Sequence, residues 1–316
     1  MYVDLMLDSL EGLSVGDAVG QQFPVMRRSI PELLAGEVPP GPWEWTDDTE
    51  MACSVVAELA GHRTIDQDRL AMSFAKRFDP ARSYGWGAQH LLRKVRLGHP
   101  WRKLSAAAFD HRGSCGNGGA MRVAPLGAYF AGKPEKAAAE AILSAQVTHM
   151  HPEGVLGAAA VAVAAAIAAQ ARLRDTRPGP VEFLTAVLEH LDGGETTGLI
   201  RHARTLLGAP LDRAVSELGN GSMVTAQNTV PLTLWVAATH LHDYPAAIAT
   251  CLAADGDIDT TGAITGGIVA TYTGTAGIPP GWLAAREPLP DWLTRDPRVR
   301  RGGKAGFGRV RQWFSR

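Results

Sequence analysis

The segment DGDIDTTGAITGG, residues 255–267, places two aspartates and a threonine directly before an apolar run rich in small residues. The segment WTDDTEMA, residues 45–52, repeats this combination far upstream. Carboxylates at such close spacing repel each other, so either a cation lies among them or they point apart into water. Because each motif precedes a helical apolar pattern, each predicts a helix that begins at an acidic turn.

Apolar residues recur at helical spacing through most of the remaining chain, whereas strand signals are few and no internal repeat is visible. Further helices are predicted over residues 3–20, 66–78, 84–98, 134–149, 180–191 and 230–241. The helix after WTDDT is expected to begin near Asp48 or Thr49 and to end at Gly61, and Pro231 is expected in a first helical turn. These patterns predict one compact all-α domain, a helical bundle, over residues 1–292.

The composition sets limits on the class of protein. With 316 residues and 46% hydrophobic content, the chain can bury a large core. Its formal net charge of −1 gives no global signal for nucleic acid or for a membrane surface. The three cysteines, Cys53, Cys115 and Cys251, are far apart, which favours a reducing cytoplasm over a disulfide scaffold or a zinc site. The sequence therefore predicts a cytoplasmic protein.

Two further segments bear on possible partners. The stretch LGAAAVAVAAAIAAQARL, residues 156–173, is nearly all alanine and is predicted to be a helix buried on all sides, without a membrane role. Residues 293–316 form a basic C-terminal tail, which is expected to be solvated or loosely docked. This tail is the one segment in which contact with nucleic acid or an acidic partner is conceivable.

The acidic motifs have the chemistry of a metal site. Hard divalent cations prefer oxygen ligands, and Mg²⁺ takes six of them. The charges balance if Asp47, Asp48, Asp257 and Asp259 all converge on two such ions. In an extended loop, the side chains of Asp257 and Asp259 would point the same way. The alternative is ordinary helix capping, because Asp and Thr are common N-cap residues.

A glycine-rich segment and a histidine pair add two candidate binding elements. GSCGNGGAMR, residues 113–122, holds four glycines, so its backbone N–H groups can approach an anion such as the diphosphate of a nucleotide. A helix is predicted to follow from near Met121; the alternative is a simple tight turn. In THMHPEG, residues 148–154, His149 either faces a substrate as a neutral imidazole or is a satisfied core histidine. No further ligand completes a zinc set there.

Taken in order, six motifs resemble those of the ADP-ribosylglycohydrolases, a family that includes dinitrogenase reductase-activating glycohydrolase and the ADP-ribosyl-acceptor hydrolases. The motifs are GDAVG (16–20), WTDDTEMA (45–52), GSCGNGGAMR (113–122), THMHP (148–152), VPLTLW (230–235) and GDIDTTGAITGG (256–267). The resemblance implies an all-α fold with a central cleft for two Mg²⁺ or Mn²⁺ ions. It also implies release of ADP-ribose from a modified protein or a small-molecule conjugate.

The resemblance assigns roles to individual residues. Metal binding is implied for Thr46, Asp47, Asp48, Asp257, Asp259 and Thr260, with Asp259 as the bridge between the ions. Substrate binding is implied for Ser114, Cys115, Gly116, Asn117, Gly118, Gly119 and Met121 around the diphosphate and distal ribose, for His149 in the cleft, and for Phe109 against adenine. Asp47 and Asp48 are the candidates for a catalytic general base.

Three departures from the family pattern shape the functional hypothesis. Pro24 stands where many relatives carry a glutamate on a mobile loop, so Glu32, Gln22 or no residue takes that role. Ser114 stands where the nitrogenase-type arginine hydrolases carry an aspartate, and Cys115 replaces a tyrosine of some members. The sequence thus favours cleavage of O-linked, serine-type ADP-ribose over arginine-linked ADP-ribose.

Two alternative functions remain open. One is a module that binds ADP-ribose or a nucleotide without turnover, which the missing glutamate favours. The other is an all-α diphosphate lyase with an aspartate-rich metal motif, although Met51 breaks the D-D-x-x-D pattern that such enzymes use.

Overall fold

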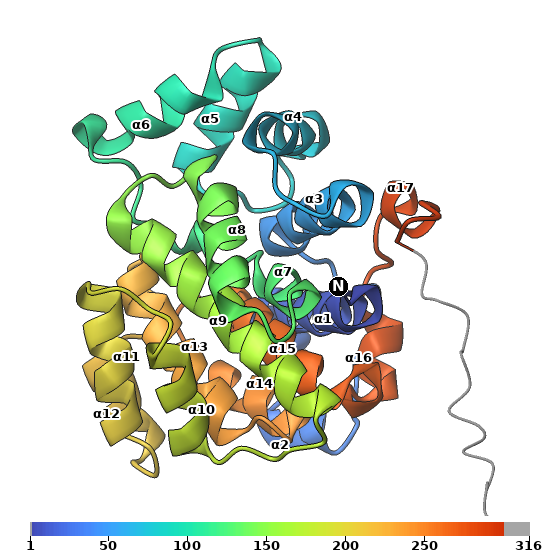
Figure 1. Cartoon of the computed structure of the whole chain (residues 1–316). Coiled ribbons are helices and arrows are strands. Elements are labelled where there is room, and N and C mark those ends of the chain that lie inside the picture. Colours follow the sequence, from blue (N-terminus) through green and yellow to red (C-terminus); the bar gives the residue numbers. More distant parts are fainter. Residues whose placement is uncertain (1, 300–316) are drawn as a thin grey trace, which may run out of the picture.

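The computed structural model describes residues 2–299, whose helices are joined by loops and turns (Figure 1). The longer helices are α1 (Val3–Met26), α3 (Asp47–His62), α4 (Gln67–Arg77), α5 (Trp86–Arg96), α6 (Trp101–His111), α8 (Pro134–Gln146), α9 (Pro152–Leu173), α10 (Pro180–Leu188), α11 (Glu195–Thr205), α12 (Leu211–Leu218), α13 (Ala226–Thr239), α14 (Tyr244–Ala254) and α15 (Ile258–Thr273). The short ones are α2 (Ile30–Leu34), η1 (Asn117–Gly119), α7 (Ala124–Tyr129), η2 (Thr275–Gly277), α16 (Pro280–Ala285) and α17 (Asp291–Thr294). Residues 2–299 contain no β-strand and only two isolated bridges, so the predicted all-α fold is confirmed.

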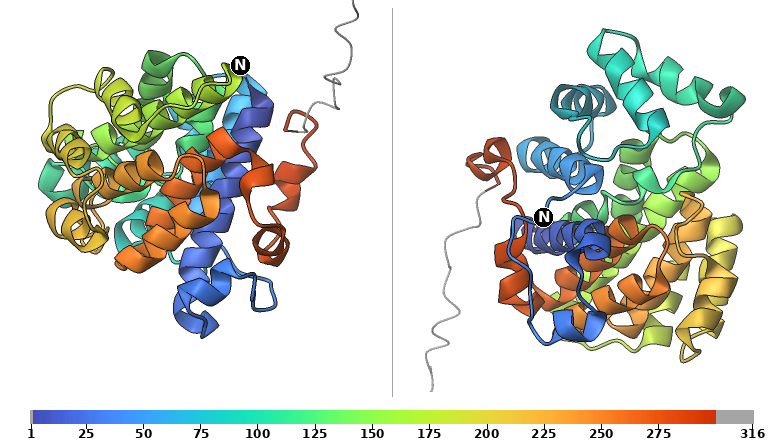
Figure 2. Two further views of the ribbon diagram at one scale, coloured as in Figure 1. Left: turned by 90° about the horizontal axis from the view of Figure 1, so that it is seen from below. Right: turned by 180° about the vertical axis from the view of Figure 1, so that it is seen from behind.

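Glycines let the two central helices, α1 and α15, approach each other closely. Gly12, Gly16 and Gly20 recur every fourth residue along α1 and so lie on one face of it. A Cβ atom on Gly16 would lie 2.1 Å from the carbonyl oxygen of Gly262, and one on Gly20 would lie 2.3 Å from that of Ile258. Figure 2 shows the two helices side by side. The glycine face therefore fixes the acidic first turn of α15 against the middle of α1.

Helix α9 is the alanine-rich helix that the sequence predicted as buried, and this prediction is confirmed. It is long and apolar enough to span a membrane by length and composition, but 78% of its apolar window is buried inside the protein. Small side chains allow close crossings here: a Cβ on Gly127 of α7 would lie 2.1 Å from the carbonyl oxygen of Ala162. Helix α9 is thus a core helix, and its first turn lies beside the glycine-rich segment.

Three predicted helix boundaries are wrong. Helix α13 begins at Ala226, so Pro231 lies inside it, because burial of the surrounding face overrides the local preference of proline for a first turn. Helix α3 continues past Gly61 to His62; a Cβ on Gly61 would lie 2.7 Å from the guanidinium of Arg298, which gives this glycine a packing role. The helix expected from near Met121 begins only at Ala124, after the η1 turn.

The C-terminal segment begins with residues that pack on the domain. Leu293 and Val299 are buried in the main hydrophobic core. Arg295 pairs with Asp291, and Arg298 pairs with Asp296. Most of the predicted basic tail, residues 300–316, lies outside the described residues.

Candidate functional site

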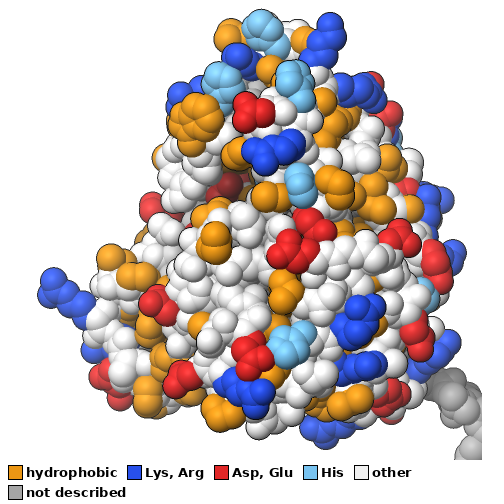
Figure 3. All heavy atoms as spheres, turned by 90° about the vertical axis from the view of Figure 1, so that its left-hand side faces the viewer, with side chains coloured by type: hydrophobic (Ala, Val, Ile, Leu, Met, Phe, Trp, Pro, Cys, Tyr) orange, Lys and Arg blue, Asp and Glu red, His pale blue; other side chains and the backbone are white. Residues whose placement is uncertain are grey.

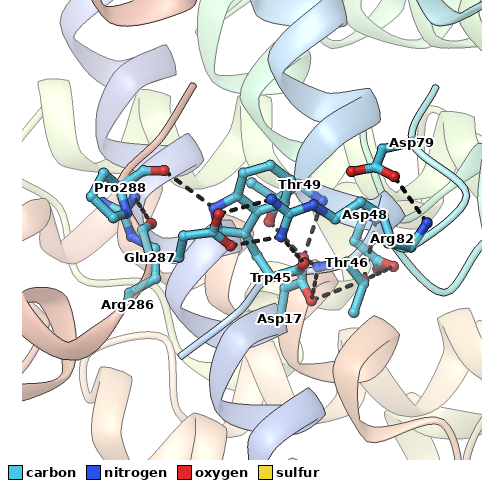
Figure 4. Close-up of polar contacts among 11 residues, drawn as sticks. Asp17, Trp45, Thr46, Asp48, Thr49, Asp79, Arg82, Arg286, Glu287 and Pro288 are labelled. Carbon is cyan, nitrogen blue, oxygen red and sulfur yellow. Dashed lines mark hydrogen bonds and ion pairs between the residues drawn. The ribbon is translucent and has the colours of Figure 1, made fainter. Parts of the chain in front are cut away.

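Asp17 of α1 holds the N-terminus of α3 in place (Figure 4). Its fully buried carboxylate accepts hydrogen bonds from the backbone N–H of Thr46 at 3.0 Å and of Thr49 at 3.1 Å. It also lies 2.9 Å and 2.6 Å from the hydroxyl oxygens of the same two threonines. A carboxylate from another helix thus satisfies N–H groups that a helix start leaves free. Sequence reasoning missed this role, although Asp17 lies in the GDAVG motif.

The first turn of α3 combines capping with an unpaired carboxylate oxygen. Thr46 is the N-cap, and its hydroxyl oxygen accepts a hydrogen bond from the Asp48 N–H at 3.4 Å. The same hydroxyl lies 3.1 Å from Asp48 Oδ2, whereas Asp48 Oδ1 is buried without any hydrogen-bond partner. Capping by the threonine therefore leaves the aspartates free, and a buried carboxylate oxygen without a partner is costly unless a ligand supplies one.

The structure gathers aspartates from three helices into one electrostatic cluster. Burial, with the nearby charge of Asp259, raises the pKa of Asp17 and that of Asp257 to about 7. Burial also raises the pKa values of Asp47 and Asp48 well above their usual range, and the negative charges of Asp17 and Asp259 raise them further. The predicted convergence of the two distant acidic motifs is therefore what the fold produces, with Asp17 as an additional member.

The geometry at the start of α15 differs from the predicted extended loop. Helix α15 begins at Ile258, so Asp257 is its N-cap and Asp259 lies in its first turn. The Asp257 Oδ2 atom accepts a hydrogen bond of 2.6 Å from the side-chain amide of Asn117. Asp259 Oδ1 accepts one of 2.9 Å from the N–H of Thr260, whose side chain is buried. The helical turn, rather than alternation along a strand, sets the directions of the two carboxylates.

The chemistry of these groups fits a hard divalent cation. The carboxylate and hydroxyl oxygens are the ligand type that Mg²⁺ and Mn²⁺ prefer, and Asp48 Oδ1 is an oxygen that lacks a partner. A cation would also offset the repulsion that raises the pKa values in the cluster. No three Asp, Glu, His or Cys side chains of residues 2–299 are arranged so as to hold a single ion together. The oxygens are instead divided between the starts of α3 and α15.

The raised pKa values predict how stability depends on pH. Folded Asp17 and Asp257 have pKa values of about 7, against an ordinary value of 3.8, so the folded chain binds protons more tightly than the unfolded chain. Their contribution to stability is full below about pH 4 and is lost as the pH rises through about 7. In EDTA, the melting temperature measured by scanning fluorimetry should fall by about 5 °C across this range.

Two controls accompany this pH profile. Millimolar Mg²⁺ should reduce the fall, because a bound cation replaces the protons. Asp257→Asn should also flatten it in EDTA, since one of the two titrating groups is removed. A melting temperature that rises with pH in EDTA, or a profile that neither Mg²⁺ nor Asp257→Asn changes, contradicts the assignment.

The glycine-rich segment joins the acidic cluster through Asn117. The Asn117 side-chain amide donates to Asp257 and, at 3.1 Å, to the hydroxyl of Thr229 on α13. The backbone turns at η1, and the Gly116 N–H donates to the Ser114 hydroxyl at 3.1 Å. Cys115 is partly exposed, and its carbonyl accepts from the N–H of Ala226. Met121 is buried below the turn.

His149 lies directly against this turn. A Cβ on Gly118 would lie 2.8 Å from His149 Cε1, and one on Gly116 would lie 3.1 Å from Nε2. The imidazole thus lies directly against these two glycines. A Cβ on Gly119 would meet Ala145 of α8 at 3.2 Å. Burial, with the charge of Arg122, lowers the pKa of His149 to about 3, so the imidazole is neutral at physiological pH.

Phe109 lies at a strained kink just before the glycine-rich segment. Its side chain is 60% exposed, and its backbone has φ 51°, in the left-handed region. The next two residues, Asp110 and His111, also have positive φ. Such conformations cost on the order of 1 kcal/mol or more per residue and cluster at functional sites. The kink leaves the aromatic ring free of the core, where it is available to a flat ligand.

The candidates for the missing glutamate lie on α1 and α2. Pro24 lies within α1, which stays helical to Met26 where relatives were expected to have a mobile loop. The Glu32 carboxylate accepts from the N–H and hydroxyl of Ser29, each at 2.7 Å, and so caps α2. Gln22 is half-buried on α1. In this chain an ordered helix end replaces the expected loop.

The surface is hollowed beside the helices that carry these residues. Figure 3 shows a recess beneath the part of the molecule that contains α5 and α6, with acidic side chains visible in its depth.

Sequence reasoning also missed Arg122, the one charged residue of the stretch AMRVAPLGAYFA, residues 120–131. Its side chain is fully buried beneath the glycine-rich turn, and a lone cation in an apolar run is the signal that identifies it.

Comparisons with known proteins identify the family of this chain. The family model of the ADP-ribosylglycohydrolases matches residues 2–304. ADP-ribosylhydrolase ARH3 of Homo sapiens is 30% identical over 280 residues, covering 77% of this chain and 74% of that protein. ADP-ribosyl-dinitrogen reductase glycohydrolase of Rhodospirillum rubrum is 25% identical over 303 residues, covering 89% and 90%. A solved ADP-ribosylglycohydrolase-related protein complex matches with a TM-score of 0.59 and 25% identity, covering 90% of this chain and 93% of that one. The chain therefore belongs to the ADP-ribosylglycohydrolase family.

Proposed function

We propose that this protein is a metal-dependent hydrolase that releases ADP-ribose from ADP-ribosylated substrates and prefers O-linked over arginine-linked ADP-ribose. The observation that carries the proposal is the buried aspartate cluster formed by α1, α3 and α15, which Asn117 joins to a glycine-rich turn. The names of the relatives, one of which acts on an ADP-ribosylated dinitrogen reductase, support the same substrate class.

The cluster offers the ligands for Mg²⁺ or Mn²⁺. The residues that would hold two such ions are Thr46, Asp47, Asp48, Asp257, Asp259 and Thr260. Bound there, the ions supply positive charge that polarises ligand oxygens and stabilises charge in the transition state. Asp17 keeps Thr46 and the first turn of α3 in position through its buried hydrogen bonds.

The chain's own residues bind and orient the ADP-ribose. The η1 turn presents backbone N–H groups to the diphosphate, and His149 lies on the same side of the turn. The exposed Phe109 ring stacks on adenine, which places the distal ribose toward the aspartates. This orientation brings the anomeric carbon next to the carboxylates.

Asp47 is the better placed of the two candidate bases. The side chain of Asp47 is partly exposed to solvent, whereas Asp48 is buried with one carboxylate oxygen beside the Thr46 hydroxyl. The water oxygen bonds to the anomeric carbon as the carbon's bond to the acceptor breaks. Asp47 takes the proton from this water and passes it to the acceptor oxygen, on which negative charge develops as its bond to the carbon breaks.

Release of ADP-ribose from serine- and arginine-modified peptides, with and without Mg²⁺, tests this function. We expect turnover with Mg²⁺ and little turnover in EDTA. Tight binding of ADP-ribose without release of product from either peptide would instead establish the binding-module alternative. Turnover of a prenyl diphosphate would establish the lyase alternative.

Ser114 predicts the preference between linkages. An arginine linkage has a guanidine leaving group that benefits from a nearby carboxylate, which Ser114 does not provide. A serine linkage leaves as an alkoxide that positive charge stabilises. We therefore expect a higher kcat/KM for the serine-linked peptide than for the arginine-linked peptide. Ser114→Asp should reduce the ratio of these two kcat/KM values by about tenfold, measured by mass spectrometry. A preference for arginine in the wild type contradicts this prediction but not the metal-dependent function.

A further inference from the structure

A buried arginine lies beneath the glycine-rich turn without a carboxylate partner. Arg122 has no exposed side-chain surface, and all its partners are neutral. Its Nη2 donates to the Ser144 carbonyl at 2.8 Å and to the Thr148 hydroxyl at 3.0 Å, and its guanidinium lies 4.7 Å from the centre of the Phe74 ring. Burial lowers the pKa of Arg122 to about 9, so it still carries its charge at neutral pH. The negative charge of Asp47 favours the charged form of Arg122, but no carboxylate is hydrogen-bonded to it. A buried cation whose hydrogen-bond partners are all neutral is costly, which calls for a functional explanation.

Thr148 connects this arginine to His149. A guanidinium has only donors, so the Thr148 hydroxyl oxygen must act as the acceptor for Arg122. The same oxygen lies 2.7 Å from His149 Nδ1. If Nδ1 carried the proton, the hydroxyl would accept twice, and its own buried proton would have no acceptor. All these groups are satisfied when the Thr148 hydroxyl accepts from Arg122 and donates its own proton to His149 Nδ1.

The other ring nitrogen of His149 then carries the proton. Its Nε2 makes no hydrogen bond with the described residues and faces the turn, since Cβ atoms on Gly116 and on Gly118 would each lie 3.1 Å from it. A neutral imidazole that accepts at Nδ1 must donate at Nε2. The imidazole therefore directs one N–H group toward the space beside the turn.

We propose that Arg122 and Thr148 are positioning residues that hold His149 as the Nε2–H tautomer, so that it donates a hydrogen bond to a diphosphate oxygen on the glycine-rich turn. The Arg122 charge also attracts an anion to the turn without contacting it. The identity of the ligand rests on the proposed function, whereas the tautomer does not.

Nitrogen-15 NMR of the full chain tests the tautomer directly. Long-range ¹H–¹⁵N spectra distinguish protonated from unprotonated ring nitrogens, and loss of the signals in His149→Gln assigns them. We expect protonation at Nε2 only, constant from about pH 5 to 8. In Thr148→Val the Nδ1–H form should become populated, because its donor is gone. Thr148→Ser should keep the wild-type pattern.

Calorimetry with ADP-ribose tests the consequence for binding. Thr148→Val should weaken ADP-ribose affinity by about tenfold, and Thr148→Ser should restore it. Thr271→Val is the matched control: it removes a buried hydroxyl that donates within α15, to the carbonyl of Gly267, and should leave the affinity unchanged. Protonation of wild-type His149 at Nδ1, or equal losses in Thr148→Val and Thr148→Ser, overturns the proposal. If ADP-ribose does not bind at all, the proposed function fails, and the NMR result alone decides the tautomer.

Discussion

Replacing Asp259 by alanine should abolish metal binding and lower kcat/KM by about a thousandfold or more. Asp259 lies in the first turn of α15, and its charge is a cause of the raised pKa values of Asp17, Asp47, Asp48 and Asp257. No other member of the cluster influences as many of its neighbours. The loss is measured as ADP-ribose release at saturating Mg²⁺, with metal affinity from calorimetry.

The stability of this variant should change in the opposite direction from its activity. In EDTA, Asp259→Ala should melt at a higher temperature than the wild type, because one repelling charge is gone. Addition of Mg²⁺ should then raise the melting temperature of the wild type but not that of the variant. A variant that is simply misfolded would melt at a lower temperature in both conditions.

Asp255→Asn is the matched control for Asp259→Ala. Asp255 is exposed and lies four residues before Asp259, and asparagine has nearly the same shape as aspartate without its charge. Its activity, its metal affinity and its response to Mg²⁺ should match those of the wild type. If Asp259→Ala retains the Mg²⁺-dependent rise in melting temperature, the metal assignment fails even if catalysis is lost.

The sequence was sufficient where local patterns carry the information. The helical periodicity predicted most of the longer helices, although not α6, α11, α12 or α14. The alanine-rich composition of residues 156–173 identified α9 as a core helix. The acidic motifs each begin a helix, as expected from their threonines and aspartates. These features depend on residues that are close together in the sequence, so the local sequence is sufficient to predict them.

What could not be predicted depends on contacts between distant segments. Pro231 lies inside α13 because burial of the helix outweighs a local preference. The first turn of α15 faces Asp17 because glycines on α1 let the two helices pack closely. The local sequence around these glycines does not reveal which helix packs against them. Arg122 meets Thr148 only after α7 and α8 have packed together. The motifs thus supplied the proposed ligands of the site, whereas the groups that support them emerged only from the fold.

Asp17 is the supporting residue whose loss should cost the most stability. Its carboxylate accepts from two backbone N–H groups of the α3 N-terminus and contacts the hydroxyls of Thr46 and Thr49. Asp17→Ala would leave these buried donors without an acceptor, so we expect a loss of about 3 kcal/mol in the free energy of unfolding, measured with urea. The expected loss exceeds that of an ordinary N-cap, about 1 kcal/mol, because several donors share this one acceptor.

Asp17→Asn separates the capping role of Asp17 from its charge. Asparagine keeps one acceptor oxygen and removes the negative charge, so it should recover part of the stability that alanine loses. In EDTA it should also shift the titration of the remaining aspartates to lower pH, because a repelling charge is absent. Metal affinity should fall less than in Asp259→Ala, since Asp17 orients Thr46 and the first turn of α3 rather than serving as a predicted ligand. Equal losses of stability in the alanine and asparagine variants would contradict this account, because they would show that a retained acceptor oxygen recovers none of the stability.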